Sequence, residues 1–437
     1  MESKPRSNKE FDMIVFGATS FVGQILCRYL VNEYTEPNFT WVMAARSADK
    51  LNALKAELGE KSKDIPMIVA DSGDEEAMRG LCQRAEVIIS TVGPYALYGE
   101  SLVKACAESG TDYCDLTGEV QWVRRMIDRY EESARASGAR IVNCCGFDSI
   151  PSDLGVKFLQ EQALQEFGSY CSQIKMRVKA TRGGASGGTI ASGINARKEA
   201  ASDPEIAAQM RDWYSICPRP LNNSATQRMV EVEYDEDFKS WVGPFIMAAI
   251  NTRVVLRSNA LREEPYASEF IYDEAVLTKD GNEGKKNAKR VGMGTALAGA
   301  VLAIPPLLWL ARKFFLPKPG EGPSPEEQRN GFFDIRMHGR TDNGDTIMVK
   351  VTGDRDPGYG STAKMLSQAA ISLHRDVDKH AIGGGFWTPA SVFGEGLMQR
   401  LRSHAGLGFE VLELQAADSG ELTVVDSADS GNGSPEQ

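Results

Sequence analysis

The sequence is poor in histidine and shows no ordered arrangement of cysteine. Its eight cysteines include no C-x-x-C pair, and only Cys144 and Cys145 are adjacent. This pattern is typical neither of a zinc site nor of a disulfide framework, so we expect reduced thiols that pack rather than act as nucleophiles. The few histidines show no metal-ligand spacing, and we expect no bound metal. They are His338, His374, His380 and His404.

The chain also lacks an apolar segment at its start and an excess of basic residues. Its opening, MESKPRSNKEFD, contains no hydrophobic region of the kind that a secretory signal needs, so we expect an intracellular protein. The net charge of −11 argues against nucleic acid as a partner. With 437 residues, of which 42% are hydrophobic and 25% charged, the composition is that of a globular protein with two domains.

Short apolar runs alternate with helical patterns through the first third of the chain. Ser47 is placed to cap one helix, Ser72 stands three residues before Glu75 as in a capping box, and Gly110 ends another helix. The alternation predicts a parallel sheet with helices on both faces. The predicted strands are 13–16, 40–46, 66–71, 85–93, 112–116 and 139–146.

The pattern changes after about residue 150. Longer mixed segments follow, and the TDNGD motif at 341–345 predicts a hairpin. We expect an antiparallel sheet with helices, forming a substrate-binding or dimerisation domain, and a capped amphipathic helix within 388–406. The predicted organisation is a disordered start at 1–10, an α/β domain at 11–150, an α+β domain at 151–415 and a disordered acidic tail at 416–437.

The stretch FGATSFVG joins the first predicted strand to the first helix. Gly17 allows a tight turn, and Gly23 allows the helix to pack closely on the sheet. Ser20 stands where the dinucleotide-binding fingerprint usually has glycine, although its hydroxyl can still donate to a phosphate. The alternative is an ordinary strand–helix turn without a ligand. The predicted pyrophosphate cradle consists of Gly17, Ala18, Thr19, Ser20, Phe21, Val22 and Gly23.

Residues at the ends of the next strands extend this predicted site. Arg46 follows the second strand, where an NAD site usually has an acidic residue, so NADP is favoured over NAD. Arg46 is alternatively a solvated surface residue. Asp71 follows the third strand and is expected near the adenine or at a helix start. Thr91, Gly93 and Pro94 follow the fourth strand, where the nicotinamide half is expected.

The catalytic candidates also follow strands of the predicted sheet. Tyr95 and Tyr98 come after the fourth strand, and either hydroxyl is able to protonate a substrate after hydride transfer; alternatively both rings pack at the domain interface. Asp115 is expected to orient substrate, to act as a base or to cap a helix. Asp148 is expected to have a functional role or to bond at the domain junction, and Asp153 to cap a helix that starts at Leu154.

No tyrosine is followed by lysine at the fourth position, which excludes the usual catalytic pair of short-chain dehydrogenases. The chain instead resembles the saccharopine dehydrogenase-like oxidoreductase family. The resemblance is nearest to the branch of the trans-acting enoyl reductases of mycobacterial lipid synthesis and the lipid-droplet-associated saccharopine dehydrogenase-like proteins. It covers about residues 11–415. The stretches that carry it are 90–119, 143–155, 185–192, 243–261 and 383–401.

The resemblance implies an NAD(P)-binding Rossmann domain followed by an α+β domain, with the last helical segment returning to pack near the first domain. It does not imply saccharopine as the substrate. An amino-diacid needs several convergent cationic groups, and the sequence shows no such cluster. This branch of the family is associated instead with lipid substrates.

Residues 291–311 form an uncharged apolar stretch with basic residues on both sides. Its length is about that needed to span a bilayer, but Pro305 and Pro306 break the helix two-thirds along. We therefore favour contact with a membrane or lipid-droplet surface over a full span. The other alternative is a buried helix or an oligomer contact. The flanking cations are Lys285, Lys286, Lys289, Arg290, Arg312, Lys313 and Lys318.

Together these features predict an NADPH-dependent oxidoreductase that reduces a carbonyl or enoyl group of a lipid or glycolipid intermediate at a membrane surface. Two alternatives remain open. One is a lipid-surface binding protein that keeps the Rossmann fold as a scaffold with little catalysis. The other is a soluble amino-acid dehydrogenase of the saccharopine type. A homodimer through the second domain is compatible with each of them.

Overall fold

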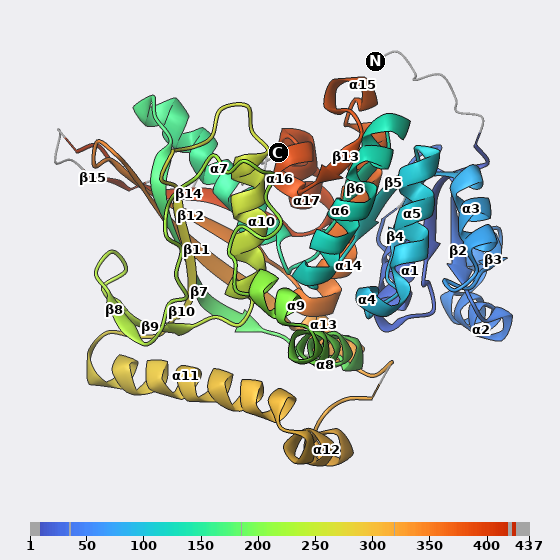
Figure 1. Ribbon diagram of the computed structural model, residues 1–437, viewed down its shortest axis with the longest axis horizontal. Coiled ribbons are helices and arrows are strands. Elements are labelled where there is room, and N and C mark those ends of the chain that lie inside the picture. Colours follow the sequence, from blue (N-terminus) through green and yellow to red (C-terminus); the bar gives the residue numbers. More distant parts are fainter. Residues whose placement is uncertain (1–8, 35, 185, 319, 418–421, 425–437) are drawn as a thin grey trace, which may run out of the picture.

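The computed structural model describes residues 9–34, 36–184, 186–318, 320–417 and 422–424. It contains two β-sheets with helices packed around and between them (Figure 1). Residues 1–8 and most of the acidic tail, which we expect to be disordered, lie outside the described residues.

The first sheet has seven strands in the order β13-β6-β5-β4-β1-β2-β3, and all its neighbours are parallel. The six strands expected from the sequence are confirmed. The seventh, β13, comes from a segment far along the chain and pairs with β6 at the sheet edge. The strands are β1 (Phe11–Phe16), β2 (Trp41–Ala45), β3 (Met67–Val69), β4 (Ala85–Ser90), β5 (Asp112–Asp115), β6 (Arg140–Val142) and β13 (Gly385–Trp387).

Helices cover both faces of this sheet, as the alternating pattern predicts. Met13 packs in the core on one face, and Ile14 packs in the core on the other. The first face is covered by α1 (Phe21–Asn32), α2 (Ala48–Leu58) and α14 (Thr362–Arg375). The second face is covered by α3 (Glu75–Arg84), α5 (Glu100–Ser109) and α6 (Val120–Ser137).

The helix ends follow the expected capping chemistry with one exception. Ser47 accepts a hydrogen bond from the Lys50 amide, and Gly110 ends α5 in a left-handed conformation. The capping box expected from Ser72 is wrong. Asp74 caps α3 instead, because its carboxylate accepts the amides of both Glu76 and Ala77.

The second sheet has eight strands in the order β15-β14-β12-β11-β7-β10-β9-β8. Its neighbours are antiparallel, as expected, except that β7 and β10 are parallel. The predicted hairpin is confirmed between β11 and β12, where Gly344 has a φ of 95°. The strands are β7 (Cys171–Arg182), β8 (Glu233–Asp235), β9 (Ser240–Pro244), β10 (Ile271–Leu277), β11 (Phe332–Thr341), β12 (Thr346–Gly353), β14 (Leu407–Gln415) and β15 (Leu422–Val424).

The helices α7 (Ile150–Phe167) and α10 (Ala248–Ala260) lie between the two sheets (Figure 1). One hydrophobic cluster runs from β1 through α7 and α14 to the inner face of the second sheet. The expectation that Asp153 caps a helix from Leu154 is wrong, since α7 begins at Ile150. The buried Asp153 carboxylate instead accepts bonds from the Ser258 hydroxyl and the Ala390 amide, at 2.6 and 2.7 Å.

The end of the chain returns to the first domain, as the resemblance implies. Gln368 on α14 donates to the Tyr29 hydroxyl of α1, which itself donates to the His404 carbonyl. The single helix expected within 388–406 is two helices, α16 (Pro389–Val392) and α17 (Glu395–His404). The expectation of disorder throughout 416–437 is wrong in one place, because β15 pairs with β14.

The apolar stretch 291–311 is divided between α11 (Gly281–Ala303) and α12 (Pro305–Phe314), and the break at the two prolines is confirmed. Among the described residues, no single helix is both long and apolar enough to cross a bilayer. The α11 and α12 helices meet that requirement only as a pair, and they are bent by 102°. The remaining helices are η1 (Glu60–Ser62), α4 (Tyr95–Tyr98), α8 (Gly187–Ser202), α9 (Pro204–Gln209), α13 (Pro325–Arg329), η2 (Pro357–Ser361) and α15 (Lys379–Ile382).

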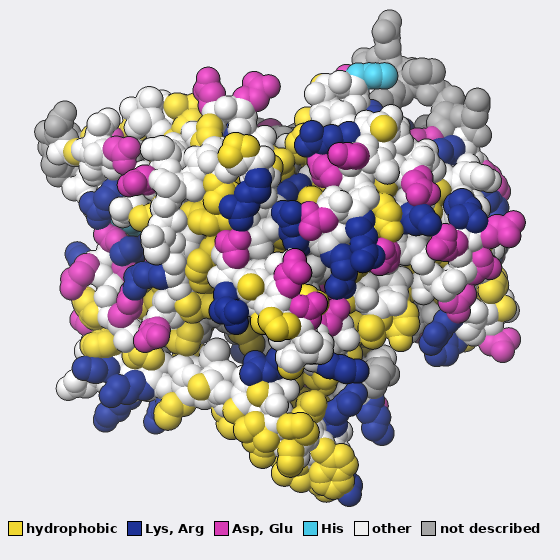
Figure 2. All heavy atoms as spheres, viewed as in Figure 1, with side chains coloured by type: hydrophobic (Ala, Val, Ile, Leu, Met, Phe, Trp, Pro, Cys, Tyr) yellow, Lys and Arg dark blue, Asp and Glu magenta, His cyan; other side chains and the backbone are white. Residues whose placement is uncertain are grey.

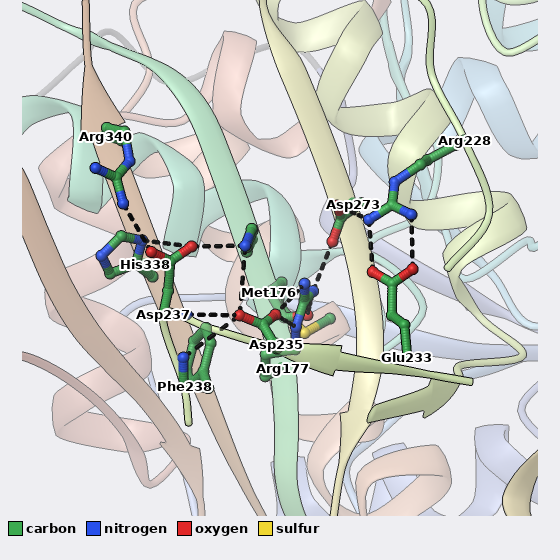
Figure 3. Close-up of polar contacts among 11 residues, drawn as sticks. Met176, Arg177, Arg228, Glu233, Asp235, Asp237, Phe238, Asp273, His338 and Arg340 are labelled. Carbon is green, nitrogen blue, oxygen red and sulfur yellow. Dashed lines mark hydrogen bonds and ion pairs between the residues drawn. The ribbon is translucent and has the colours of Figure 1, made fainter. Parts of the chain in front are cut away.

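Within the second sheet, a network of ion pairs joins the β8–β9 hairpin to β7, β10 and β11 (Figure 3). Arg177 on β7 is completely buried, and its guanidinium lies 2.6 Å from the carboxylates of both Asp235 and Asp273. Asp237, in the hairpin, pairs with Lys175 at 2.6 Å. Buried charges at these distances compensate one another, so the network fixes where the hairpin sits.

Candidate functional site

The turn between β1 and α1 has the geometry that a dinucleotide site requires. Gly17 has a φ of 89°, and a Cβ there would lie 2.7 Å from the Thr91 hydroxyl oxygen. A Cβ on Gly23 would lie 2.1 Å from the Gly17 carbonyl oxygen. Both positions therefore need glycine, for the turn and for the close approach of α1.

Three amides at this turn are free to bind an anion. Within the described residues, no acceptor reaches the backbone N–H groups of Thr19, Phe21 or Val22. Free amides at a helix start, together with the helix dipole, form a site for phosphate. The amide of Ala18 is not available, because it donates to the Ala44 carbonyl at 3.1 Å.

The proposed donation from Ser20 to a phosphate is wrong. Its hydroxyl oxygen caps α1 by accepting the Gly23 amide at 3.0 Å, and it lies 2.9 Å from the Thr91 hydroxyl. Thr91 donates its own proton to the Gly17 carbonyl, so Ser20 must donate to Thr91. Ser20 therefore holds the turn in shape and leaves phosphate binding to the backbone.

Arg46 directly follows β2. The Ala44 carbonyl of the same strand accepts hydrogen bonds from the Gly17 and Ala18 amides of the glycine turn. Its side chain is exposed and has no ion-pair partner in the described part of the chain. Asp71 is exposed after β3, where its carboxylate accepts the Gly73 amide at 2.9 Å and shapes a turn. The role of Arg46 in selecting NADP stays a prediction.

We predict that Arg46→Ala weakens NADPH binding by about tenfold or more and leaves NADH binding nearly unchanged. The reason is that a hydrogen bond to a charged group contributes about 1.5–3 kcal/mol, and only NADPH carries the 2′-phosphate. Fluorescence titration with each nucleotide measures both affinities. Arg79→Ala, which removes an exposed arginine on α3, is the matched control. Equal losses for the two nucleotides would contradict the assignment.

The residues after β4 divide into two groups. Thr91 is buried against the glycine turn, and in the bend that follows Gly93 is exposed and Pro94 is half-buried. Tyr95 does not face a substrate, because it is buried against Trp122 and its hydroxyl donates to the Ser90 carbonyl at 2.8 Å. The proposed proton donation by Tyr95 is therefore wrong.

The structure also removes Asp115 from the candidate bases. Its carboxylate is completely buried and accepts four hydrogen bonds, from two amides and from the Asn143 and Tyr113 side chains. Burial raises its pKa to about 6 in spite of these donors. Asp115 thus joins β5 to the start of the segment after β6. Tyr98, at the end of α4, is exposed and stays a prediction.

Asp148 lies where the two domains meet. Its carboxylate is partly buried and receives no hydrogen bond from the described residues, and burial raises its pKa to about 6. A Cβ on Gly118 would approach it to 3.5 Å and the Ile250 side chain to 3.0 Å. Asp148 therefore faces a junction formed by segments from both domains, and its role stays a prediction.

The α8 helix crosses this junction from the second domain. Ser186 caps it by accepting the Thr189 amide at 3.4 Å. Ser192 on the same helix donates to Glu119 at 2.8 Å. Glu119 also accepts the Tyr95 and Ala96 amides, so it connects α8 to the start of α4.

Tyr359 is a site residue that the sequence analysis missed. It lies in η2, its ring contacts that of Phe21 with centroids 5.1 Å apart, and its hydroxyl lies 3.0 Å from the Thr189 hydroxyl. The only sequence signal is a glycine-rich DPGYGS motif before an amphipathic helix, and nothing in it indicates contact with residue 21. Tertiary structure alone places it beside the glycine turn.

The cysteines take no part in the site. Cys144 and Cys145 are buried, and burial raises the pKa of each thiol well above its ordinary value, so packing roles are confirmed. Among the described residues, no group of three or more histidine, cysteine or acidic side chains is arranged to hold a metal ion.

Known proteins resemble this chain along nearly its whole length. A family model described as the saccharopine dehydrogenase NADP binding domain matches residues 13–142. A putative trans-acting enoyl reductase of Mycobacterium tuberculosis is 36% identical over 430 residues, which cover 95% of this chain and 100% of that protein. A trans-acting enoyl reductase of Mycobacterium bovis is 34% identical over 422 residues, covering 90% and 96%. Saccharopine dehydrogenase (L-Glu forming) from Saccharomyces cerevisiae superposes with a TM-score of 0.49 at 13% identity, covering 92% of this chain and 100% of that one.

Proposed function

The chain belongs to the saccharopine dehydrogenase-like oxidoreductase family and is an NADP-binding oxidoreductase, and we propose that it reduces a carbonyl or enoyl group of a lipid or glycolipid intermediate at a membrane or lipid-droplet surface. NADPH, when bound, supplies the hydride. The observation that carries the proposal is an exposed apolar surface on α11 and α12, joined to the cofactor turn by a short segment. The names of the relatives support an enoyl group as the acceptor.

This surface, which we call the α11–α12 patch, is unusually apolar for solvent-exposed helices. Trp309, Phe314 and Phe315 are 61%, 62% and 81% exposed. The alternative of a buried helix is therefore wrong. Figure 2 shows hydrophobic side chains gathered over α12. The members of the patch are Met293, Leu297, Ile304, Leu307, Trp309, Leu310, Phe314 and Phe315.

Cations surround the patch and suit an anionic lipid surface. Lys313 lies over the rings of Trp309 and Phe314, with its Nζ 5.0 and 5.3 Å from their centroids. Arg312 is next to it on α12, and Figure 2 shows further lysine and arginine side chains beside the apolar ones. Apolar side chains that enter the acyl region, with basic residues at headgroup level, are typical of helices that lie in a membrane interface.

Two contacts connect the patch to the cofactor turn. The segment after α12 returns to the site, where the Glu321 carbonyl accepts the Gly187 amide at 3.0 Å. Next to it, a Cβ on Gly322 would meet the Phe21 ring at 2.5 Å, so this backbone lies directly on that ring. These contacts place the segment that follows the patch beside the cofactor turn, which supports a substrate that arrives from the lipid side.

We predict that the double variant Trp309→Glu/Phe314→Glu loses binding to vesicles of equal parts phosphatidylcholine and phosphatidylglycerol. Burial of each ring contributes about 1.5–3 kcal/mol, so affinity should fall by about tenfold or more for each substitution. Vesicle co-sedimentation measures binding, and NADPH fluorescence tests whether the cofactor site is intact. Val69→Glu, at an apolar residue 58% exposed on the far edge of the first sheet, is the matched control.

Each outcome separates the alternatives. The proposal expects vesicle binding by the wild type together with NADPH oxidation when a long-chain trans-2-enoyl thioester is dissolved in the vesicles. Vesicle binding without turnover of enoyl or carbonyl lipids would indicate a lipid-surface binding protein. Turnover of saccharopine without vesicle binding would indicate a soluble amino-acid dehydrogenase. A wild-type protein that dimerises through the patch and does not bind vesicles would overturn the proposal.

A further inference from the structure

We propose that Tyr359 is the catalytic acid of this site, and that its hydroxyl protonates the substrate after hydride transfer. The inference rests on the proposed reduction, and it assigns the proton donor that Tyr95 and Asp115 do not provide. Three observations carry it: the place of Tyr359 near the carboxyl ends of the strands, the partners of its hydroxyl, and a hydroxyl path to solvent.

The first observation is position. Tyr359 packs edge-on against Phe21, whose amide is one of the free amides of the pyrophosphate cradle. Thr362, at the start of α14, accepts the amide of Phe147 at 2.9 Å, so η2 lies against the segment that follows β6. In an open parallel sheet, ligands bind beyond these carboxyl ends of the strands. Tyr359 therefore borders the region where the reacting groups meet.

The second observation is the surroundings of the hydroxyl. The Tyr359 oxygen accepts a hydrogen bond from the Ser186 amide at the start of α8 and lies 3.0 Å from the Thr189 hydroxyl. Burial raises the Tyr359 pKa and the Asp148 charge adds to this effect, although the Ser186 and Thr189 hydrogen bonds oppose it. The hydroxyl thus keeps its proton until a stronger base forms beside it. Donors already aimed at the oxygen stabilise the phenolate that results.

The third observation is a path for proton return. Thr189 is exposed, whereas Tyr359 is buried, so the threonine hydroxyl stands between the tyrosine oxygen and solvent. The backbone around Tyr359 is held as well, because the buried Asp356 carboxylate accepts the Tyr359 amide at 2.9 Å. A proton donor needs a fixed position and a route by which it regains its proton from water. The held Tyr359 ring and the neighbouring Thr189 hydroxyl provide both.

Once an enoyl substrate has accepted hydride at its β-carbon, the electron pair of the double bond rests on the enolate. The Tyr359 O–H bond breaks, and its proton forms the new C–H bond at the α-carbon. The phenolate then takes a proton from Thr189, which takes one from water. One proton from solvent is consumed in each reduction.

The direct test places 3-fluorotyrosine at position 359 of the full chain and follows its fluorine NMR signal through a pH titration. NADP⁺ and NADPH carry the same phosphates, and the nicotinamide is positive only in NADP⁺, so we expect the pKa of this phenol to be lower by about 1 or more with bound NADP⁺ than with bound NADPH. The charged groups near the ring, Asp148 and Asp356, are the same with and without nucleotide. Fluorotyrosine at Tyr266, a buried residue of the second domain, is the control and should not respond. A pKa at position 359 that is the same with saturating NADP⁺ and saturating NADPH would overturn the assignment.

The kinetic test uses Tyr359→Phe with the vesicle-borne trans-2-enoyl thioester. We expect kcat to fall by about 100- to 10,000-fold while the NADPH dissociation constant stays within about twofold, since general acid catalysis contributes that range. The fluorotyrosine variant, which keeps the hydroxyl, should restore turnover. Full activity of Tyr359→Phe would overturn the proposal. If the wild type does not turn over this thioester, the proposed substrate is wrong, and the fluorine titration still decides the place of Tyr359.

Discussion

Gly23→Ala is expected to weaken NADPH binding by about 100-fold or more. The added Cβ would lie 2.1 Å from the Gly17 carbonyl oxygen and 3.0 Å from the Ala18 backbone. These are main-chain atoms of the cradle, so the overlap is relieved only if α1 moves away from the turn, and a displacement of about 1 Å is enough to cost such a factor in a preorganised site. Titration of NADPH by its fluorescence measures the loss.

Gly80→Ala is the matched control for this substitution. Gly80 lies within α3, and a Cβ there meets no atom within 4 Å. Alanine in a helix interior should be neutral or stabilising by about 0.5–1 kcal/mol, with NADPH binding unchanged. Ordinary NADPH affinity in Gly23→Ala would show that the close approach of α1 is not needed, and would remove the glycine turn from the cofactor site.

Arg177→Ala is expected to lower the free energy of unfolding by about 3–5 kcal/mol. The substitution leaves the buried carboxylates of Asp235 and Asp273 without the buried cation that they share, and removing one partner of a buried ion pair is strongly destabilising. Denaturant unfolding followed by circular dichroism measures the change. NADPH binding by the variant should persist below the unfolding transition, because the network lies on the second sheet (Figure 3).

Arg340→Ala is the control within the same network. Arg340 pairs with Asp237 at 2.7 Å but is 45% exposed, so its removal should cost less than about 1 kcal/mol. Similar losses of unfolding free energy in Arg177→Ala and Arg340→Ala would contradict the conclusion that burial makes the Arg177 ion pairs the more stabilising ones.

The pH dependence of unfolding provides a second measurement of how much the ion pairs of this network stabilise the protein. Burial alone would raise the pKa of Asp235, but the Arg177 and Lys175 cations lower it below its ordinary value. A lowered pKa contributes stability above the unfolded value of about 3.9, and that stability is lost as the pH falls through the folded value. The wild type should therefore lose more stability than Arg177→Ala when the pH is lowered below about 4.

Local chemistry explains which site predictions agree with the structure. Gly17 and Gly23 are identifiable because a strand precedes them and a helix follows, and the same local order places Arg46 and Thr91 at strand ends. Tyr95 occupies such a position as well, yet its ring turns inward against Trp122. The order of strands and helices along the chain indicates that a residue lies at a strand end. Packing against distant helices decides where its side chain points.

Buried carboxylates show the same limit. Asp115 follows a strand, as a catalytic base would, but its four donors include Asn143 and the amide of Cys144, from the segment after β6. Nothing in the sequence between 115 and 143 indicates that these groups converge. Whether a carboxylate is a base or a structural acceptor depends on which donors the fold brings to it.

The sequence by itself determined the parallel sheet, the glycine turn, the NADP-binding family and the break at Pro305. Each of these depends on residues that are close in the chain, where hydrophobic period, backbone freedom and proline geometry act directly. Only the tertiary structure decided that β13 completes the first sheet, that the α11–α12 patch is exposed, and that Tyr359 meets Phe21 and α8. The pairing of β13 and the contacts of Tyr359 join segments more than a hundred residues apart, and they form because the two domains share one hydrophobic core, which no local pattern encodes.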